Sequence, residues 1–102
     1  MKRTVFLTPG IVELGSQSEQ IHIQIAKKLI EKKIDLIILI QTKGTRFMQQ
    51  YFDKYSNNKM KNDFLPEILT FESARIAHIE LKKILQLDDI ILFQNDLTDN
   101  YS

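Results

Sequence analysis

The sequence predicts an α/β fold, a three-layer Rossmann-like sandwich built around a mainly parallel sheet. Four short apolar runs lack the polar alternation of half-exposed strands, which is typical of strands covered on both faces. Three segments with apolar residues at helical spacing separate these runs. Strands and helices therefore alternate along the chain, as they do in folds with a parallel sheet.

The strands follow the apolar runs and are expected at residues 3–8, 35–40, 67–71 and 89–94. Pro66 restricts the backbone where the third strand begins, and Asp88-Asp89 separates the fourth strand from the preceding helix. The connections are long enough for right-handed crossovers. We therefore expect the sheet order 3-2-1-4, with the first strand central and helices on both faces.

The helices fill the three intervals between the strands. The first is expected to begin at Ser16, which forms a capping box with Glu19 three residues later. The second is expected to begin within residues 42–45 and to end before Ser56. The third is expected over residues 74–85, where an apolar stripe recurs at helical spacing.

Composition narrows the classes of protein that fit. The chain has 102 residues, and domains commonly contain about 100–150, so one domain is expected. Because 14 Lys and Arg balance 13 Asp and Glu, the net charge of +1 gives no broad attraction to nucleic acid or an anionic membrane. The longest apolar stretch, residues 34–40, is far shorter than the roughly 20 residues that cross a bilayer. With no Cys for a disulfide, these features predict a soluble, cytoplasmic protein.

The predicted strand order nominates a ligand site. Ligands of open α/β sheets bind at the carboxyl ends of strands, where the strand order reverses. Here that switch point lies between the first and fourth strands. The substrate-binding candidates near it are Thr8, Glu13, Asn95 and Asp96. The alternative is that these are ordinary polar groups of exposed loops and of a polar chain end.

Residues 42–46 follow the second strand and open a helix, so backbone N–H groups there could hold an anion. Lys43 and Arg46 are the candidate contacts to a phosphate or carboxylate. The Gly-x-x-x-x-Gly-Lys-Ser/Thr order of a phosphate-binding P-loop is absent. A solvated helix start is the alternative interpretation.

The two histidines predict no chemistry. His22 and His78 lie on or beside the apolar stripe of a predicted helix, where a single histidine is usually packed and hydrogen-bonded. Without a matching Cys or an adjacent acidic pair, we expect no metal site. The sequence has neither a Gly-x-Ser-x-Gly elbow nor a Cys nucleophile, and no catalytic residue is assigned.

Residues 3–25, RTVFLTPGIVELGSQSEQIHIQI, resemble the carboxy-terminal domain of the Mur ligase family. They look most like the branch that adds D-alanyl-D-alanine to UDP-N-acetylmuramoyl-tripeptide, and its close relatives. In that family a strand leads into a Gly-x-Met-x-Glu-Leu-Gly-like turn, then an acidic helix start and a Leu-His pair. The turn is matched by Gly10, Glu13, Leu14 and Gly15, and the pair by Ile21-His22. DLIILIQTKGTR and LTFESARIAHIELKKILQLDDIILFQNDLTDNY are similar to later segments, so the resemblance covers nearly the whole chain.

The resemblance implies an ATP-dependent ligase of peptidoglycan precursor synthesis. Such a ligase activates a carboxylate as an acyl phosphate with ATP and Mg²⁺, then joins it to an amine. In the family, a central domain carries the P-loop and most metal ligands, and an amino-terminal domain carries the nucleotide-sugar site. We therefore expect residues 1–102 to be a truncated terminal domain that helps to bind the amine and closes over ATP. Its partners would be the other two domains, and alone it is expected to bind no cofactor and to catalyse no reaction.

Two departures from the family pattern leave the added amino acid or dipeptide open. Thr8-Pro9-Gly10 stands where many members have Gly-Asp-Met, and Gln94-Asn95-Asp96 replaces a Lys-Gly-Ser type of ending. The alternative function is a free-standing α/β binding or interaction module without catalysis. An upstream P-loop in the same reading frame would favour the ligase.

Overall fold

The computed structural model describes residues 3–11, 14–58 and 64–93. Its elements, in chain order, are β1 (Thr4–Thr8), the 3-10 turn η1 (Gly15–Gln17), α1 (Ser18–Glu31), β2 (Leu36–Ile40), α2 (Lys43–Asn58), β3 (Glu67–Phe71), α3 (Ala74–Ile84) and β4 (Ile90–Phe93). The strands form one parallel sheet in the order β3-β2-β1-β4. The predicted fold class and strand order are confirmed.

β1 lies in the middle of this sheet and pairs with strands from both halves of the chain. On one side the pairing runs from Val5 opposite Leu36 to Thr8 opposite Leu39. On the other side it runs from Thr4 opposite Ile90 to Leu7 opposite Phe93. The strand order therefore reverses between β1 and β4, as expected for a switch point at the carboxyl edge.

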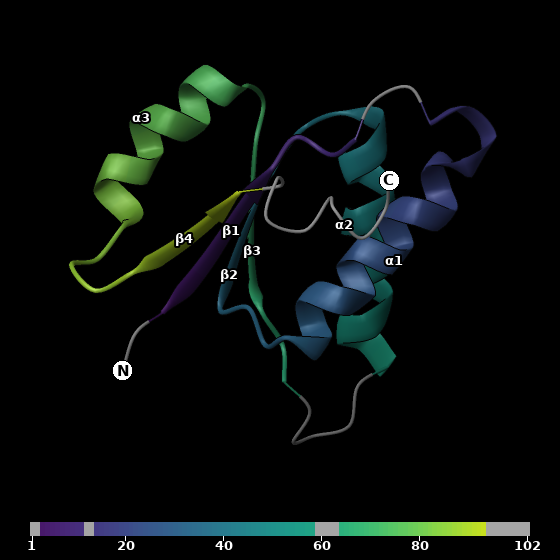
Figure 1. Cartoon of the computed structure of the whole chain (residues 1–102), viewed down its shortest axis with the longest axis horizontal. Helices are drawn as coiled ribbons and strands as arrows, with labels where there is room; N and C mark the ends of the chain where they lie inside the picture. Colours follow the sequence, from purple (N-terminus) through teal and green to yellow (C-terminus); the bar gives the residue numbers. More distant parts are fainter. Residues whose placement is uncertain (1–2, 12–13, 59–63, 94–102) are drawn as a thin grey trace.

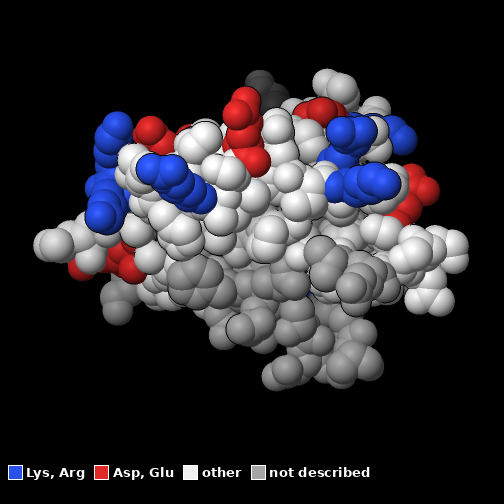
Figure 2. Space-filling view, turned by 90° about the horizontal axis from the view of Figure 1, so that it is seen from above, with Lys and Arg blue, Asp and Glu red and all other residues white. Residues whose placement is uncertain are grey.

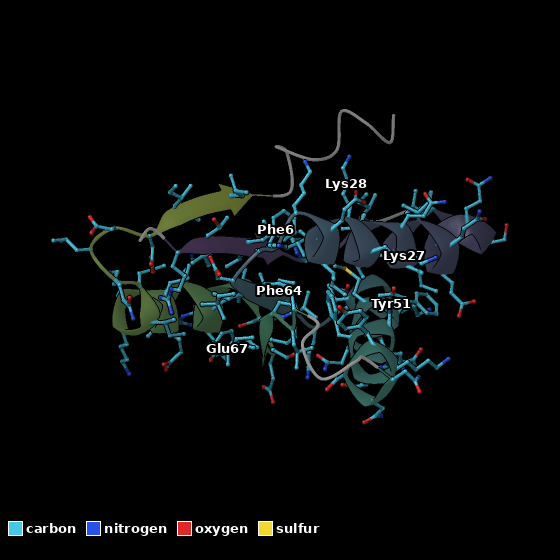
Figure 3. The ribbon with its side chains drawn as sticks, turned by 90° about the horizontal axis from the view of Figure 1, so that it is seen from below. Phe6, Lys27, Lys28, Tyr51, Phe64 and Glu67 are labelled. Carbon is cyan, nitrogen blue, oxygen red and sulfur yellow. The ribbon has the colours of Figure 1, made fainter. Side chains whose placement is uncertain are left out.

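Helices cover both faces of the sheet and complete three layers, with α1 and α2 on one side and α3 on the other (Figure 1). Phe6 of β1 points toward the α1 and α2 layer, where it packs with Leu29 and Phe52 (Figure 3). On the opposite face Val5 and Leu7 share a core with Leu81 of α3. The alternation of side chains along β1 thus supplies both cores.

Burial differs between the central and the edge strands. All residues of β2 are buried, in agreement with the prediction for strands covered on both faces. That prediction is wrong for the edge strands, because β3 is only half-buried and Ile90 of β4 is 44% exposed. α3 packs against β2 and β3, which leaves β4 with less cover on that face of the sheet.

The start of the first helix departs from the expected capping box. Gly15 has a φ of +57°, and the chain makes the turn η1 before α1 begins at Ser18. The Ser18 N–H donates to the Gly15 carbonyl, and the side chain of Gln17, the residue before α1, makes no capping bond. A carbonyl of the turn therefore accepts the first N–H of α1, and the helix begins two residues later than the capping box predicts.

The helix ends are held by specific hydrogen bonds. α2 continues to Asn58, beyond the predicted stop before Ser56, and the side-chain amide of Asn58 donates to the Lys54 carbonyl at 2.9 Å. At the end of α1, Lys33 takes a φ of +57°. The Lys33 N–H then donates to Ile30 O at 3.0 Å and the Ile34 N–H to Leu29 O at 3.1 Å, which is the Schellman pattern.

An ion pair joins the start of β1 to the residue before β4. The guanidinium of Arg3 donates to both carboxylate oxygens of Asp89, at 2.7 and 3.1 Å, and also to Ile84 O at 3.0 Å. The hydrogen bond from Arg3, helped by the Gln86 N–H, lowers the pKa of Asp89 below its ordinary value.

None of the helices in the described part of the chain combines the length and apolar character needed to cross a bilayer.

Candidate functional site

The carboxyl end of β1 is a tight turn built on Thr8. The Thr8 side chain is 2% exposed, and its hydroxyl accepts the Gly10 N–H at 2.9 Å. Gly10 follows with a φ of +82°, a conformation that glycine adopts without the steric cost of a Cβ. In this structure the Thr8 hydroxyl orders the backbone of the loop, and its predicted contact to substrate stays a prediction.

His22 of α1 lies beneath this turn and is fully buried. Its Nε2 accepts the N–H of Ile11 at 3.0 Å, so the ring proton lies on Nδ1, which donates to the Ser18 carbonyl at 2.6 Å. Both ring nitrogens are therefore used by backbone groups. The prediction that His22 is a packed, hydrogen-bonded residue is confirmed, whereas the same prediction for His78 is wrong, because His78 is exposed on α3.

Two glycines make room for the His22 ring. A Cβ added at Gly10 would lie 2.9 Å from Nε2, and one at Gly44, in the first turn of α2, would overlap the ring. The Thr42 hydroxyl also donates to Pro9 O at 2.7 Å. The turn after β1, the start of α1 and the start of α2 thus form one packed unit at the carboxyl edge of the sheet.

The start of α2 is fixed by a reciprocal pair of threonines. The Thr42 N–H donates to the Thr45 hydroxyl at 2.9 Å, and the Thr45 N–H donates to the Thr42 hydroxyl at 3.1 Å. Thr45 is 2% exposed and its hydroxyl also donates to Ile40 O at 2.7 Å. These bonds set the direction in which α2 leaves β2.

A pocket of about 460 Å³ opens beside this helix start, at the carboxyl ends of β2 and β3. The residues that line it are Leu39, Gln41, Thr42, Lys43, Thr45, Arg46, Gln49 and Thr70. Figure 2 views the molecule from the top of Figure 1 and shows Lys and Arg side chains in two groups, on the α3 side and on the α1 and α2 side. The pocket lining includes two cations and no carboxylate.

The structure places three of the six predicted site residues. Lys43 and Arg46 line the same pocket, whereas Thr8 is buried in the turn after β1. Glu13, Asn95 and Asp96 lie outside the described residues. The pairing of Leu7 with Phe93 does bring the ends of β1 and β4 side by side, as the predicted switch point requires.

Sequence reasoning missed the polar side chains that share the pocket with the two cations. Gln49 lies one turn beyond Arg46 on α2, a spacing that could have indicated a shared face. Thr70 belongs to β3 and enters the pocket because Thr70 pairs with Leu39. Because Thr70 lies between apolar residues in the sequence, no local pattern predicts that it lines a pocket.

Comparisons with known proteins add no assignment. No protein-family model, no curated protein and no solved structure matches the chain. Within the described residues, no group of three or more His, Cys, Asp or Glu side chains is arranged to hold a metal ion. The site must therefore be interpreted from its own geometry and from the resemblance in the sequence.

Proposed function

We propose that this chain is the terminal domain of a Mur-type ligase, an ATP-dependent enzyme that joins a carboxylate to an amine in peptidoglycan precursor synthesis. In this proposal the switch point between β1 and β4 helps to bind the incoming amine. The central domain of the parent ligase holds ATP and Mg²⁺, which supply the activated acyl phosphate. The present chain, as the terminal domain, closes over them.

The observation that carries the proposal is how the residues of the resemblance fold. Gly10 and Gly15 both have positive φ, and His22 binds the backbone of Ile11 from beneath the turn. The spacing from Gly10 to His22 thus has a physical reason, because Gly10 and the His22 ring meet at the carboxyl end of the central strand. This placement supports a ligand-binding role for the carboxyl edge of the sheet at β1.

The chemistry proposed for this edge is recognition of an ammonium group. The carboxylates of Glu13 and Asp96 would attract the positive charge of the amine substrate, and Asn95 would orient a neighbouring polar group. On either side of Glu13, the Ile11 N–H is held by His22 and the Leu14 carbonyl accepts the Gln17 N–H at 3.2 Å.

The test is an amide-ligation assay on the longest natural reading frame that contains this chain. Glu13→Ala and Asp96→Ala are each expected to raise the KM for the amine or lower kcat by about tenfold or more, the cost of losing a charged hydrogen bond. The matched control is Glu31→Ala, at the opposite end of α1 and exposed, which should keep wild-type kinetics.

The melting temperature of each variant separates a binding role from a structural one. Unchanged melting with impaired kinetics supports the proposal. If both variants keep wild-type kinetics, or lose activity only by unfolding, the amine site is wrong. Absence of ligation from the whole reading frame would instead favour the alternative, a binding or interaction module without catalysis.

A further inference from the structure

The pocket beside α2 lies apart from the switch point. It opens at the carboxyl ends of β2 and β3, whereas the switch point lies between β1 and β4. We propose that this pocket binds a phosphate monoester carried on a small hydroxyl-rich molecule, such as a sugar phosphate. This inference does not rest on the proposed ligase function.

The charge of the pocket comes from Lys43 and Arg46. Their separation of three residues places both side chains on the same side of α2. In the described part of the chain, the ion pairs join Arg3 to Asp89 and Lys83 to Glu80, so neither pocket cation has a carboxylate partner there. Both side chains are exposed at the mouth and accessible to a ligand from solution.

The threonines at the helix start are already used by the fold. The Thr42 hydroxyl donates to Pro9 O and the Thr45 hydroxyl donates to Ile40 O, both at 2.7 Å. These hydroxyl protons are thus committed to backbone carbonyls. Among the side chains that line the pocket, the charged donors are the ammonium of Lys43 and the guanidinium of Arg46.

The far side of the pocket is polar and ordered. The Thr70 hydroxyl donates to the Gln49 amide oxygen at 2.9 Å, and the Gln49 amide nitrogen donates to Asp53 at 3.2 Å. With its proton committed, the Thr70 oxygen retains a lone pair that can accept a hydroxyl proton from a ligand. This wall therefore suits a hydroxyl-bearing body rather than an apolar one.

Charge and size together select the class of ligand. A phosphate monoester carries about −1.5 to −2 charges at neutral pH. The two cations of the pocket therefore balance its charge more closely than they balance the single charge of a carboxylate. The planar guanidinium of Arg46 can also bind two phosphate oxygens at once. A volume of about 460 Å³ leaves room for a sugar-sized body beside the phosphate.

The test is a titration of the isotope-labelled 102-residue chain followed by amide NMR shifts. The probes are glucose 6-phosphate, inorganic phosphate, gluconate and glucose. Glucose 6-phosphate should shift the amides of residues 42–49 and of Thr70, with a lower Kd than inorganic phosphate. Gluconate is expected to bind about tenfold more weakly or worse, because it carries one charge, and glucose should give no shifts.

Charge-removing variants locate the site. Lys43→Gln and Arg46→Gln should each raise the Kd for glucose 6-phosphate by about tenfold or more. Arg75→Gln is the matched control, because Arg75 is an exposed arginine in the first turn of α3, on the opposite face of the sheet. Thr70→Val should reduce the preference for glucose 6-phosphate over inorganic phosphate without moving the Kd for phosphate.

Each contrary result has a defined meaning. An unchanged Kd in both Lys43→Gln and Arg46→Gln, or an equal loss in Arg75→Gln, would overturn the site. Equal binding of gluconate and glucose 6-phosphate would overturn the assignment to a phosphate monoester. Equal binding of inorganic phosphate and glucose 6-phosphate would overturn the proposal that the pocket recognises a hydroxyl-rich body. A failed ligation assay leaves these outcomes unaffected, since they are measured by binding alone.

Discussion

His22 is the residue that holds the carboxyl edge of the sheet together. Its ring is fully buried, bonds two backbone groups and lies against Gly10 of the turn after β1 and Gly44 of the first turn of α2. A buried polar ring is tolerated only when its hydrogen bonds are satisfied, and here both nitrogens are. A side chain added at Gly44 should therefore disturb the packing and hydrogen bonds of His22.

We expect Gly44→Ala to destabilise the protein by about 1–3 kcal/mol, because the new methyl group must displace the His22 ring. In an open helix the same change would stabilise by up to about 1 kcal/mol, so the sign of the effect is diagnostic. Urea unfolding measures the difference. The cost should be smaller when His22→Ala is also present, giving a non-additive cycle. Stabilisation by Gly44→Ala alone would contradict this packing.

At the scale of elements, the sequence predicted the strands and helices well and their ends less well. Runs such as Leu36–Ile40 predict strands because burial on both faces removes polar alternation. The turn η1 could not be predicted from Ser16 and Glu19, because the left-handed Gly15 redirects the chain before the helix. At the other end of α1, the left-handed residue is Lys33.

Lys33→Gly should stabilise the protein by about 0.5–1 kcal/mol. A left-handed conformation costs an L-residue roughly 1–2 kcal/mol, and glycine avoids this cost. Part of the gain is lost because glycine raises the conformational entropy of the unfolded chain. The neighbouring Lys32 has a φ of −80°, so Lys32→Gly should give no gain and lose up to about 1 kcal/mol. Denaturant midpoints of the two variants should move in opposite directions. Movement in the same direction would argue against the Schellman ending.

At the scale of the whole molecule, Arg3 and Asp89 join positions 86 residues apart. Because the pKa of Asp89 is lowered in the folded state, the pair contributes stability above the ordinary aspartate value of 3.8. That contribution should be lost as the pH falls from about this value through the lowered pKa. Asp89→Asn should remove this part of the acid destabilisation, and Arg3→Gln should remove the larger share of it, because the Gln86 N–H still bonds Asp89. Urea midpoints between pH 7 and pH 2 measure it, and wild-type pH dependence in both variants would contradict the linkage.

The candidate site was predictable in part. The switch point follows from element order, because right-handed crossovers leave few sheet orders open, and the pairing of β1 with β4 confirms it. Lys43 and Arg46 were found because they follow a strand and open a helix. The pocket wall that includes Thr70 was not predicted, because it depends on the register between β2 and β3, which no local pattern encodes.

The central position of β1 also has a consequence for synthesis on the ribosome. β1 is translated before the other strands of this sheet, and its second neighbour, β4, follows 86 residues later. At about 5–20 residues per second, roughly 4–17 s pass before that partner exists. During this interval one hydrogen-bonding edge of β1 has no native partner, and unpaired strand edges invite pairing with other chains. A nascent-chain chaperone therefore has a defined window in which to shield this central strand.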